Sequence, residues 1–220
     1  MESVSQQINI GGIIQFGNYD WRILDVQYDK ALILAEDIIE KRAYDSSSPD
    51  FDLDEMPDDK YEGMKKVTWE ICTLRKYLNG EFLKNFTKEE QQRIEETPLI
   101  NNDNLWYESK GGEKTIDKIF LLSLEEADKY FYGSGDYTNK KRKDFDDDKI
   151  FDSENGPCFS RINDLKEMKK DGKAFWWLRS PGYENNYAAY VIGDCYIFAV
   201  LGYFASFSYG GVRPALWLTL

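Results

Sequence analysis

The sequence predicts a single α+β domain, and three observations support this class. Short apolar segments typical of β-strands fill the first 36 residues and the last third of the chain. Segments with helical spacing of apolar residues lie between them. No internal repeat or change of composition divides the 220 residues, and this length suits one domain with a sizeable core. We expect one domain over residues 1–220, with mixed, mostly antiparallel sheets, several short helices and long loops.

The first part of the chain is typical of an antiparallel β-meander. Apolar segments at 13–16, 21–26 and 31–35 are separated by turn signals around Gly17 and Tyr28. The third segment is apolar throughout, which is typical of a strand buried on both faces. We expect these strands to share a sheet with the final segment, Ala215–Leu220. That arrangement would bring the termini together.

Apolar spacing and capping residues predict four helices in the middle of the chain. They are expected at Thr68–Asn79, after Thr87, after Ser123 and at Ser160–Lys170. Glutamates stand three residues after Thr87 and Ser123, which is the spacing of a capping box. A short buried strand is predicted at Lys118–Leu122.

Two polar segments are expected to be irregular inserts. They span residues 45–66 and 133–155. In the second, Asp144, Asp146 and Asp148 match the first ligand positions of a calcium loop. Lys149 replaces the glycine that such a loop requires, and Asn155 replaces its final glutamate. We therefore expect no cofactor, with calcium at this loop as the alternative.

Composition limits the function classes. A net charge of −12 argues against nucleic acid and anionic membranes as partners, because phosphate binding needs clustered cations. The basic run Lys140–Lys143 is followed at once by acidic residues and is interpreted as a solvated loop. The absence of histidine excludes histidine-based catalysis and metal ligation. No residue pattern indicates catalysis, so we expect that the protein is not an enzyme.

The cysteine residues and the N-terminal residues indicate the cellular compartment. Cys72, Cys158 and Cys195 have no CxxC spacing, which is typical of reduced thiols in a cytoplasmic setting. The N-terminal residues lack the pattern of a signal peptide, and no stretch of about 18 apolar residues occurs. We expect a cytoplasmic or phage-associated protein without membrane insertion.

The C-terminal segment predicts a binding surface. WWLRSPG (176–182) and GVRPALWL (211–218) bracket residues 183–209, which are rich in Tyr and Phe, also contain Asn, Ser, Ala, Gly and Asp, and contain no Lys or Arg. Rigid aromatic residues beside small adaptable ones are typical of antibody binding loops. We predict a surface that binds a protein or glycan and leave the oligomeric state open. Its residues are Tyr183, Asn185, Asn186, Tyr187, Tyr190, Ile192, Asp194, Tyr196, Phe198, Tyr203, Phe204, Phe207 and Tyr209.

The alternative for these aromatic residues is a place in the core. We favour exposure for the tyrosines and asparagines, because a buried tyrosine hydroxyl needs a hydrogen-bond partner. For Phe198 and Phe207 both interpretations stay open. Framework positions are expected at Ala189, Val191, Ile197 and Val200.

The bracketing motifs are expected to form the framework. Trp176 and Trp177 are adjacent, so on a strand they point to opposite faces. One of them is expected in the core, and the other either in the core or under the binding surface. Arg179 and Arg213 are expected to hold loop carbonyls or a buried acid, rather than a ligand carboxylate.

Five segments together are similar to a bacterial and phage domain family of unknown function marked by WWLRSPG…GVRPALWL. They are Lys30–Ile38, Val67–Phe82, Asp117–Phe131, Trp176–Gly182 and Gly211–Leu218. The likeness runs from about Gly12 to Leu220.

The C-terminal half also resembles the C-type-lectin-like fold of the variable proteins of diversity-generating retroelements. This resemblance implies a C-type-lectin-like domain in which error-prone copying at adenines replaces codons within residues 183–209. Lys and Trp are not reachable from the asparagine codons that such systems often change, and the segment contains neither.

Two other functions remain as alternatives. A relative of the same fold, the formylglycine-generating enzyme, is an oxidase with a copper-binding cysteine pair, but Cys158 and Cys195 do not sit in its pattern. A phage or structural display module that binds only its own assembly is the second alternative.

Overall fold

The computed structural model describes residues 8–47, 66–105, 107–132, 175–192 and 196–220, and the side chains of Tyr132 and of residues 192–201 lie outside this description. The strands are β1 (Ile13–Phe16), β2 (Tyr19–Gln27), β3 (Lys30–Ala35), β4 (Glu40–Lys41), β5 (Thr97–Leu99), β6 (Thr115–Asp117), β7 (Phe175–Pro181), β8 (Tyr187–Ile192), β9 (Tyr196–Phe204), β10 (Gly211–Val212) and β11 (Ala215–Thr219). The helices are α1 (Thr73–Leu78), the 3-10 helix η2 (Phe82–Asn85), α2 (Lys88–Arg93), α3 (Leu124–Ala127) and the π-helix η3 (Asp128–Tyr132).

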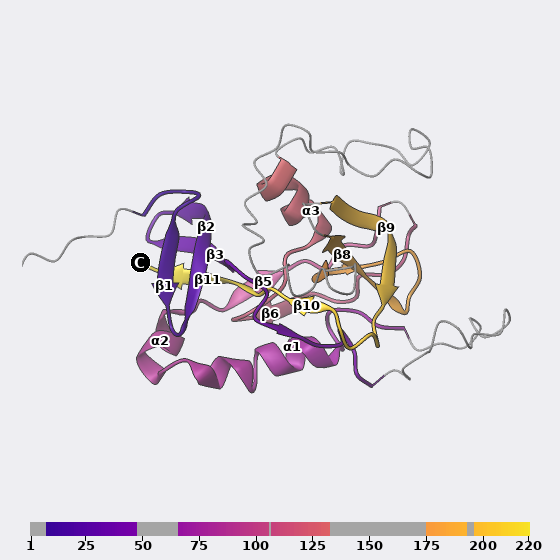
Figure 1. Cartoon of the computed structure of the whole chain (residues 1–220), viewed down its shortest axis with the longest axis horizontal. Helices are drawn as coiled ribbons and strands as arrows, with labels where there is room; N and C mark the ends of the chain where they lie inside the picture. The colour runs from indigo at the N-terminus through magenta and orange to yellow at the C-terminus, as the bar shows by residue number, and fades with distance from the viewer. Residues whose placement is uncertain (1–7, 48–65, 106, 133–174, 193–195) are drawn as a thin grey trace, which may run out of the picture.

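The first sheet joins the start of the chain to its end. Its strand order is β1-β2-β3-β11, and every pair is antiparallel. The apolar strand β3 lies between β2 and β11 with five of its six residues buried. β11 pairs with β3 from Ala215 to Thr219, and the Leu220 amide donates to Asp29 O at 2.8 Å. The predicted sharing of one sheet by the first strands and the last is confirmed (Figure 1).

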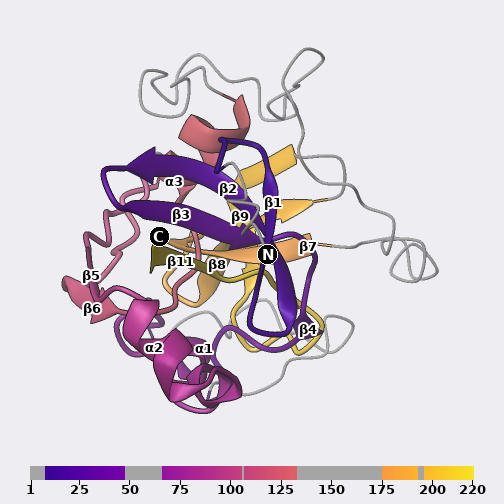
Figure 2. The same cartoon turned by 90° about the vertical axis from the view of Figure 1, so that its left-hand side faces the viewer.

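The second sheet contains both bracketing motifs. Its order is β4-β10-β7-β8-β9, and a short separate ribbon pairs β5 with β6. β10 runs parallel to β7 through Gly211 and Trp176, whereas the other pairs are antiparallel. Figures 1 and 2 show α1 and α2 along one side of the molecule and α3 on the opposite side. The predicted α+β class with mostly antiparallel sheets is confirmed.

One apolar core runs through both sheets. Trp21, Trp69 and Trp177 are fully buried, each from a different part of the chain. Trp176 is buried as well, so neither tryptophan of the motif contributes to an exposed surface. Trp177 meets Tyr44 on its face of β7, with ring centroids 6.0 Å apart.

The observed helices have the predicted capping residues, but their lengths differ from the predicted ones. Both predicted capping boxes, at Thr87 and at Ser123, are confirmed. The first helix begins at Thr73 rather than Thr68, because residues 68–72 form a turn whose Cys72 thiol caps the helix by accepting from the Arg75 amide. Ile71, expected on the apolar face, is 38% exposed. The predicted helix at 160–170 lies outside the described residues, as do the insert 133–155 and most of 45–66.

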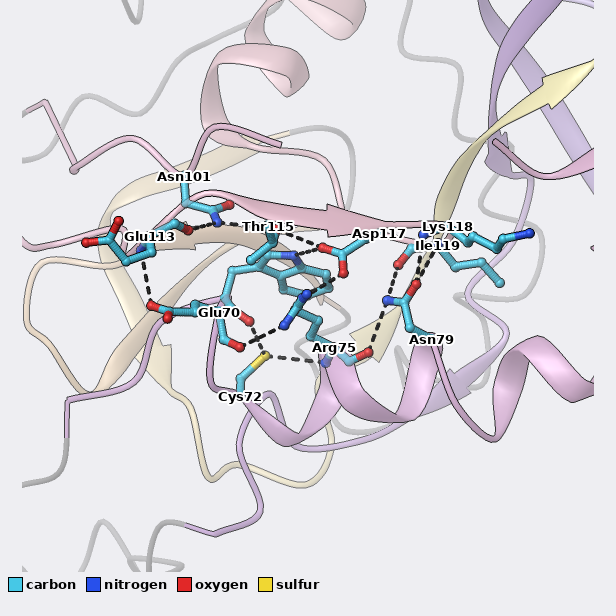
Figure 3. Close-up of polar contacts among 11 residues, drawn as sticks. Glu70, Cys72, Arg75, Asn79, Asn101, Glu113, Thr115, Asp117, Lys118 and Ile119 are labelled. Atoms are coloured by element: carbon cyan, nitrogen blue, oxygen red, sulfur yellow. Dashed lines mark hydrogen bonds and ion pairs between the residues drawn. The ribbon is translucent and has the colours of Figure 1, made fainter. Parts of the chain in front are cut away.

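The prediction of a strand at 118–122 is wrong, because the strand in this region lies before residue 118. The strand β6 ends at Asp117, and only Phe120 forms a bridge, with Ala215. The Asn79 side chain at the end of α1 accepts from the amides of Lys118 and Ile119 at 2.8 and 3.1 Å (Figure 3). These amides therefore bind a side chain instead of a neighbouring strand.

The two motif arginines, Arg179 and Arg213, bind backbone carbonyl groups of the framework, as expected. Arg213 is 2% exposed and donates from Nε to Ala35 O at 2.8 Å and from Nη2 to Glu36 O at 2.9 Å. Burial lowers its pKa to about 10, against the opposing effect of Glu36. Arg179 donates to Leu121 O at 2.9 Å and pairs through both terminal nitrogens with the carboxylate of Glu126.

We expect Arg213→Leu to lower the free energy of unfolding by about 3 kcal/mol, because two buried carbonyl oxygens lose their donor. Urea unfolding followed by tryptophan fluorescence measures this change. Arg93→Leu is the matched control, since Arg93 also donates two hydrogen bonds to a backbone carbonyl, Thr219 O, but on the surface. Its effect should stay within about 0.5 kcal/mol. Equal, small effects of both changes would contradict the framework role of Arg213.

Candidate functional site

Part of the predicted binding segment lies at the surface. Tyr209 is 64% exposed, and Tyr183, Asn185, Tyr203 and Phe207 are half-buried. These five residues are the accessible members of the predicted site whose side chains are described.

Other members of the predicted site are inside the protein. The predicted exposure is wrong for Asn186, Tyr187 and Tyr190, which are 9%, 8% and 7% exposed, and Phe204 is also buried. Tyr187 and Phe204 are cross-strand partners on β8 and β9, with ring centroids 4.4 Å apart, so each covers the other. Asp194 and the side chains of Ile192, Tyr196 and Phe198 lie outside the described residues.

The aromatic residues form two clusters, which meet where the Tyr203 and Phe204 ring centroids lie 6.2 Å apart. The Tyr203 cluster consists of Phe175, Tyr190, Tyr203, Phe207 and Tyr209, with neighbouring ring centroids 4.5–5.9 Å apart. Its inner members, Phe175 and Tyr190, are buried, and its outer member Tyr209 is exposed. The cluster therefore runs from the core to the surface.

The Tyr183 cluster consists of Tyr107, Tyr183, Tyr187 and Phe204. The Tyr107 and Tyr183 rings meet edge to face at 6.0 Å, and Tyr183 packs on Tyr187 at 4.7 Å. The sequence analysis did not single out Tyr107, because the stretch 101–114 around it is mostly polar. The signal was the run Leu105-Trp106-Tyr107 inside that polar segment.

The loop 205–210, which carries Phe207 and Tyr209, is held at both ends. The Asp45 amide donates to Ala205 O at 2.7 Å, and the Arg42 amide donates to Gly210 O at 2.8 Å. Since both donors belong to one short segment, residues 42–45, the two ends of the loop have a common support.

That support is itself fixed to the strand β7. The Trp177 indole donates to Arg42 O at 2.8 Å, and the Tyr44 hydroxyl donates to Arg179 O at 2.9 Å. Gly210 lies against the same indole, and a Cβ atom there would stand 2.1 Å from Trp177 Nε1. A larger residue than glycine therefore cannot occupy position 210 unless the loop moves.

The turn after β7, which carries Tyr183 and Asn185, is held by two other loops. The Asn104 amide group donates to Pro181 O at 3.0 Å, and the Ser109 hydroxyl donates to Gly182 O. The Val67 amide donates to Asn185 O at 2.7 Å. Both surface regions are thus built on backbone positions fixed by hydrogen bonds.

Two tyrosines of the Tyr203 cluster, Tyr190 and Tyr203, stay uncharged over a wide pH range. Burial raises the pKa of Tyr190 to about 12, and the neighbouring Tyr203 adds to this effect. Burial also raises the pKa of Tyr203. Both hydroxyl groups are therefore neutral at physiological pH and can donate as well as accept hydrogen bonds.

The polar network beneath α1 has a structural role. The Asp117 carboxylate accepts from Arg75 Nε at 2.7 Å, the Trp69 indole at 2.9 Å and the Thr115 hydroxyl at 2.8 Å (Figure 3). Burial raises the pKa of the adjacent Cys72 thiol to about 12, so it is not a reactive thiolate. These polar groups form hydrogen bonds with one another, which supports a structural role instead of ligand binding.

Metal and thiol chemistry would depend on parts of the chain outside this description. In the residues that the structure describes, no three Asp, Glu or Cys side chains are grouped to hold a metal ion. The calcium-like aspartates at 144–148 and the thiols of Cys158 and Cys195 lie beyond those residues.

The fold and the two clusters define an α+β protein that carries partly exposed aromatic residues on fixed backbone supports. The chain belongs to the family described as "Domain of unknown function (DUF6273)", whose model matches residues 28–220. The resemblance to a domain family of unknown function is thereby confirmed. No curated protein and no solved structure matches the chain. None of the helices in the described ranges is long and apolar enough to cross a membrane.

We expect Gly210→Ala to lower the free energy of unfolding by about 2 kcal/mol, because the added methyl group overlaps the buried Trp177 ring. Near-ultraviolet circular dichroism should change at the same time, since the environment of Trp177 changes. Ser208→Ala, at an exposed position of the same loop, is the control and should leave both signals unchanged. A neutral Gly210→Ala would mean that the loop is not held against the indole.

Proposed function

We propose that this protein is a ligand-binding protein that recognises a protein or glycan through the exposed parts of its two aromatic clusters. The observation that carries the proposal is the support of the loop 205–210 at both ends by residues 42–45. Binding sites on rigid supports lose little conformational entropy when a ligand binds. Recognition then depends on contact and hydrogen bonding, without bond formation or cleavage.

The composition of the accessible residues fits this role. Tyr183, Tyr203 and Tyr209 each combine a flat apolar ring with a hydroxyl group, and such residues are enriched in binding interfaces. Asn185 and the exposed Ser208 add small polar groups beside them. The buried Asn186, Tyr187 and Tyr190 belong to the framework in this proposal.

A C-type-lectin-like fold is part of the same proposal. It is supported by the pairing of the first strands with the last one, and by the neighbouring positions of the two motifs, where Gly211 pairs with Trp176. A cytoplasmic or phage-associated location, the absence of nucleic acid as a partner and the absence of a required cofactor remain proposals as well.

We further propose that a retroelement diversifies residues 183–209. Support comes from the lack of Lys and Trp in this segment and from the fixed motifs on both sides of it. Diversification is useful only where a side chain reaches the ligand. We therefore expect changes at Tyr183, Asn185, Tyr203, Phe207 and Tyr209, and constancy at the buried Tyr187 and Tyr190.

The binding function can be tested on a glycan microarray and on an array of purified bacterial surface proteins. We expect Tyr209→Ala to weaken every positive interaction by about tenfold or more, as for a central aromatic contact residue. Tyr28→Ala is the matched control, because Tyr28 is fully exposed on the hairpin between β2 and β3, in the other sheet. Equal binding by both variants and the unchanged protein would count against this surface.

Diversification can be tested on the genomic DNA that surrounds the coding sequence. We expect an imperfect copy of the codons for residues 183–218 next to a reverse transcriptase gene, with differences confined to adenines of the copy. Populations of the gene should vary at codon 209 and not at codon 187. Differences spread evenly over exposed and buried codons would contradict the proposal.

A further inference from the structure

An ammonium group lies at the outer end of the Tyr203 cluster. Lys41 Nζ is 5.9 Å from the centroid of the Tyr209 ring, and both side chains are exposed. From Tyr209 the rings continue to Phe207 at 5.5 Å and then to Tyr203 at 4.5 Å. The accessible part of the cluster is therefore a row of rings that ends at a cation.

The ammonium group of Lys41 is available to a ligand. Among the described residues, no carboxylate forms an ion pair with it and no side-chain hydrogen bond uses it. The preceding carboxylate, that of Glu40, pairs with Arg42 Nη2 at 3.5 Å, and alternate residues of a strand point to opposite faces. A cation–π contact at the surface is weak and leaves the ammonium N–H groups free to donate. Lys41 can therefore pair with an anionic group.

The backbone at Lys41 is fixed to the loop that carries Tyr209. Lys41 and Gly211 are partners in the pairing of β4 with β10, and the next amide, that of Arg42, donates to Gly210 O at 2.8 Å. Because Lys41 lies outside residues 183–209, it belongs to the constant scaffold of the proposed function. Every side chain that diversification places at position 209 would lie beside the same cation.

The exposed part of Tyr209 fits a sugar ring. Tyr209 is 64% exposed, and its ring contacts among the described residues are those with Phe207 and Lys41. Its hydroxyl group makes no hydrogen bond to a described residue. A sugar presents apolar C–H groups on a face of its ring and hydroxyl groups around the edge. An exposed phenol ring offers a surface for the first and a hydrogen-bonding partner for the second.

We propose that Lys41 and Tyr209 bind a sugar acid, whose carboxylate pairs with the Lys41 ammonium group while its ring packs against the Tyr209 ring. This inference rests on the proposed function and narrows it from protein or glycan to a glycan that carries a carboxylate. The net charge of −12 favours this ligand over an acidic protein, because one carboxylate in an otherwise neutral glycan meets less repulsion than a segment with many.

Biolayer interferometry of the full chain tests this inference on two biotinylated probes, sialyllactose and glucuronyl-lactose. The methyl ester of each probe is its control, because it keeps the rings and removes the charge. We expect Lys41→Gln to weaken binding of at least one sugar acid by about two- to fivefold. Lys41→Arg should retain binding within about twofold, since the positive charge stays.

Two further variants complete the test. Tyr209→Leu should weaken binding of the same sugar acid by about two- to fivefold, through loss of the aromatic ring and its hydroxyl group. Lys30→Gln is the matched control and should leave binding unchanged. It removes the same charge from a similar contact in the other sheet, because Lys30 Nζ lies 5.2 Å from the centroid of the Trp217 ring.

The outcomes separate this inference from the proposed function. Equal binding of the methyl esters, or equal losses with Lys30→Gln and Lys41→Gln, would overturn the inference. Binding of neither sugar acid would overturn it as well, and so would binding of a biotinylated tetra-glutamate peptide in their place, which would assign Lys41 to an acidic protein. In each of these cases a surface that binds its array targets through Tyr209 keeps the proposed function intact. Loss of sugar-acid binding with Lys41→Gln and Tyr209→Leu, with the Lys30→Gln control unchanged, supports both.

Discussion

The guanidinium group of Arg213 lies where the chain passes twice between the two sheets. It binds the carbonyl groups of Ala35 and Glu36, at the point where β3 ends and the chain continues towards β4. Pro214 accepts from the Ala35 amide at 2.8 Å, so the connection from β10 to β11 lies beside the one from β3 to β4. A buried arginine is costly unless its donors are used. These contacts therefore fix the two crossings to one another.

The aromatic surface depends on the same crossing. The segment after β4 supplies the Arg42 and Asp45 amides that bind both ends of the loop 205–210. Its position is set by β4, which pairs with β10 immediately before Arg213. A displacement at Arg213 would thus move the support and the loop together. The loop with the exposed rings is therefore bound firmly to the scaffold. Its surface residues can change while the backbone beneath them stays in place.

The sequence predicted the framework better than the surface, and the reasons are physical. Capping boxes and an apolar strand depend on neighbouring residues, so local patterns reveal them. The structural role of Arg213 was indicated by its motif, whereas its partners Ala35 and Glu36 lie far away in the chain. The burial of Tyr187 and Tyr190 depends on cross-strand pairing with a register shift between Ala188 and Tyr190 and on a positive φ of 61° at Gly202. Such irregularities break the alternation from which exposure is inferred. The contact between Tyr107 and Tyr183 joins segments far apart in the chain, and no local pattern shows it.

Residue-resolved hydrogen exchange of the native protein tests the central claim most directly, because it measures how firmly the support holds the loop. The account predicts that the amides of Arg42 and Asp45 exchange about as slowly as the amide of Ala35 at the crossing, since all three then open only with the core. Exchange of the Arg42 and Asp45 amides near the rate of an unfolded chain, with Ala35 still protected, would contradict it. The aromatic loop would then move independently of the scaffold.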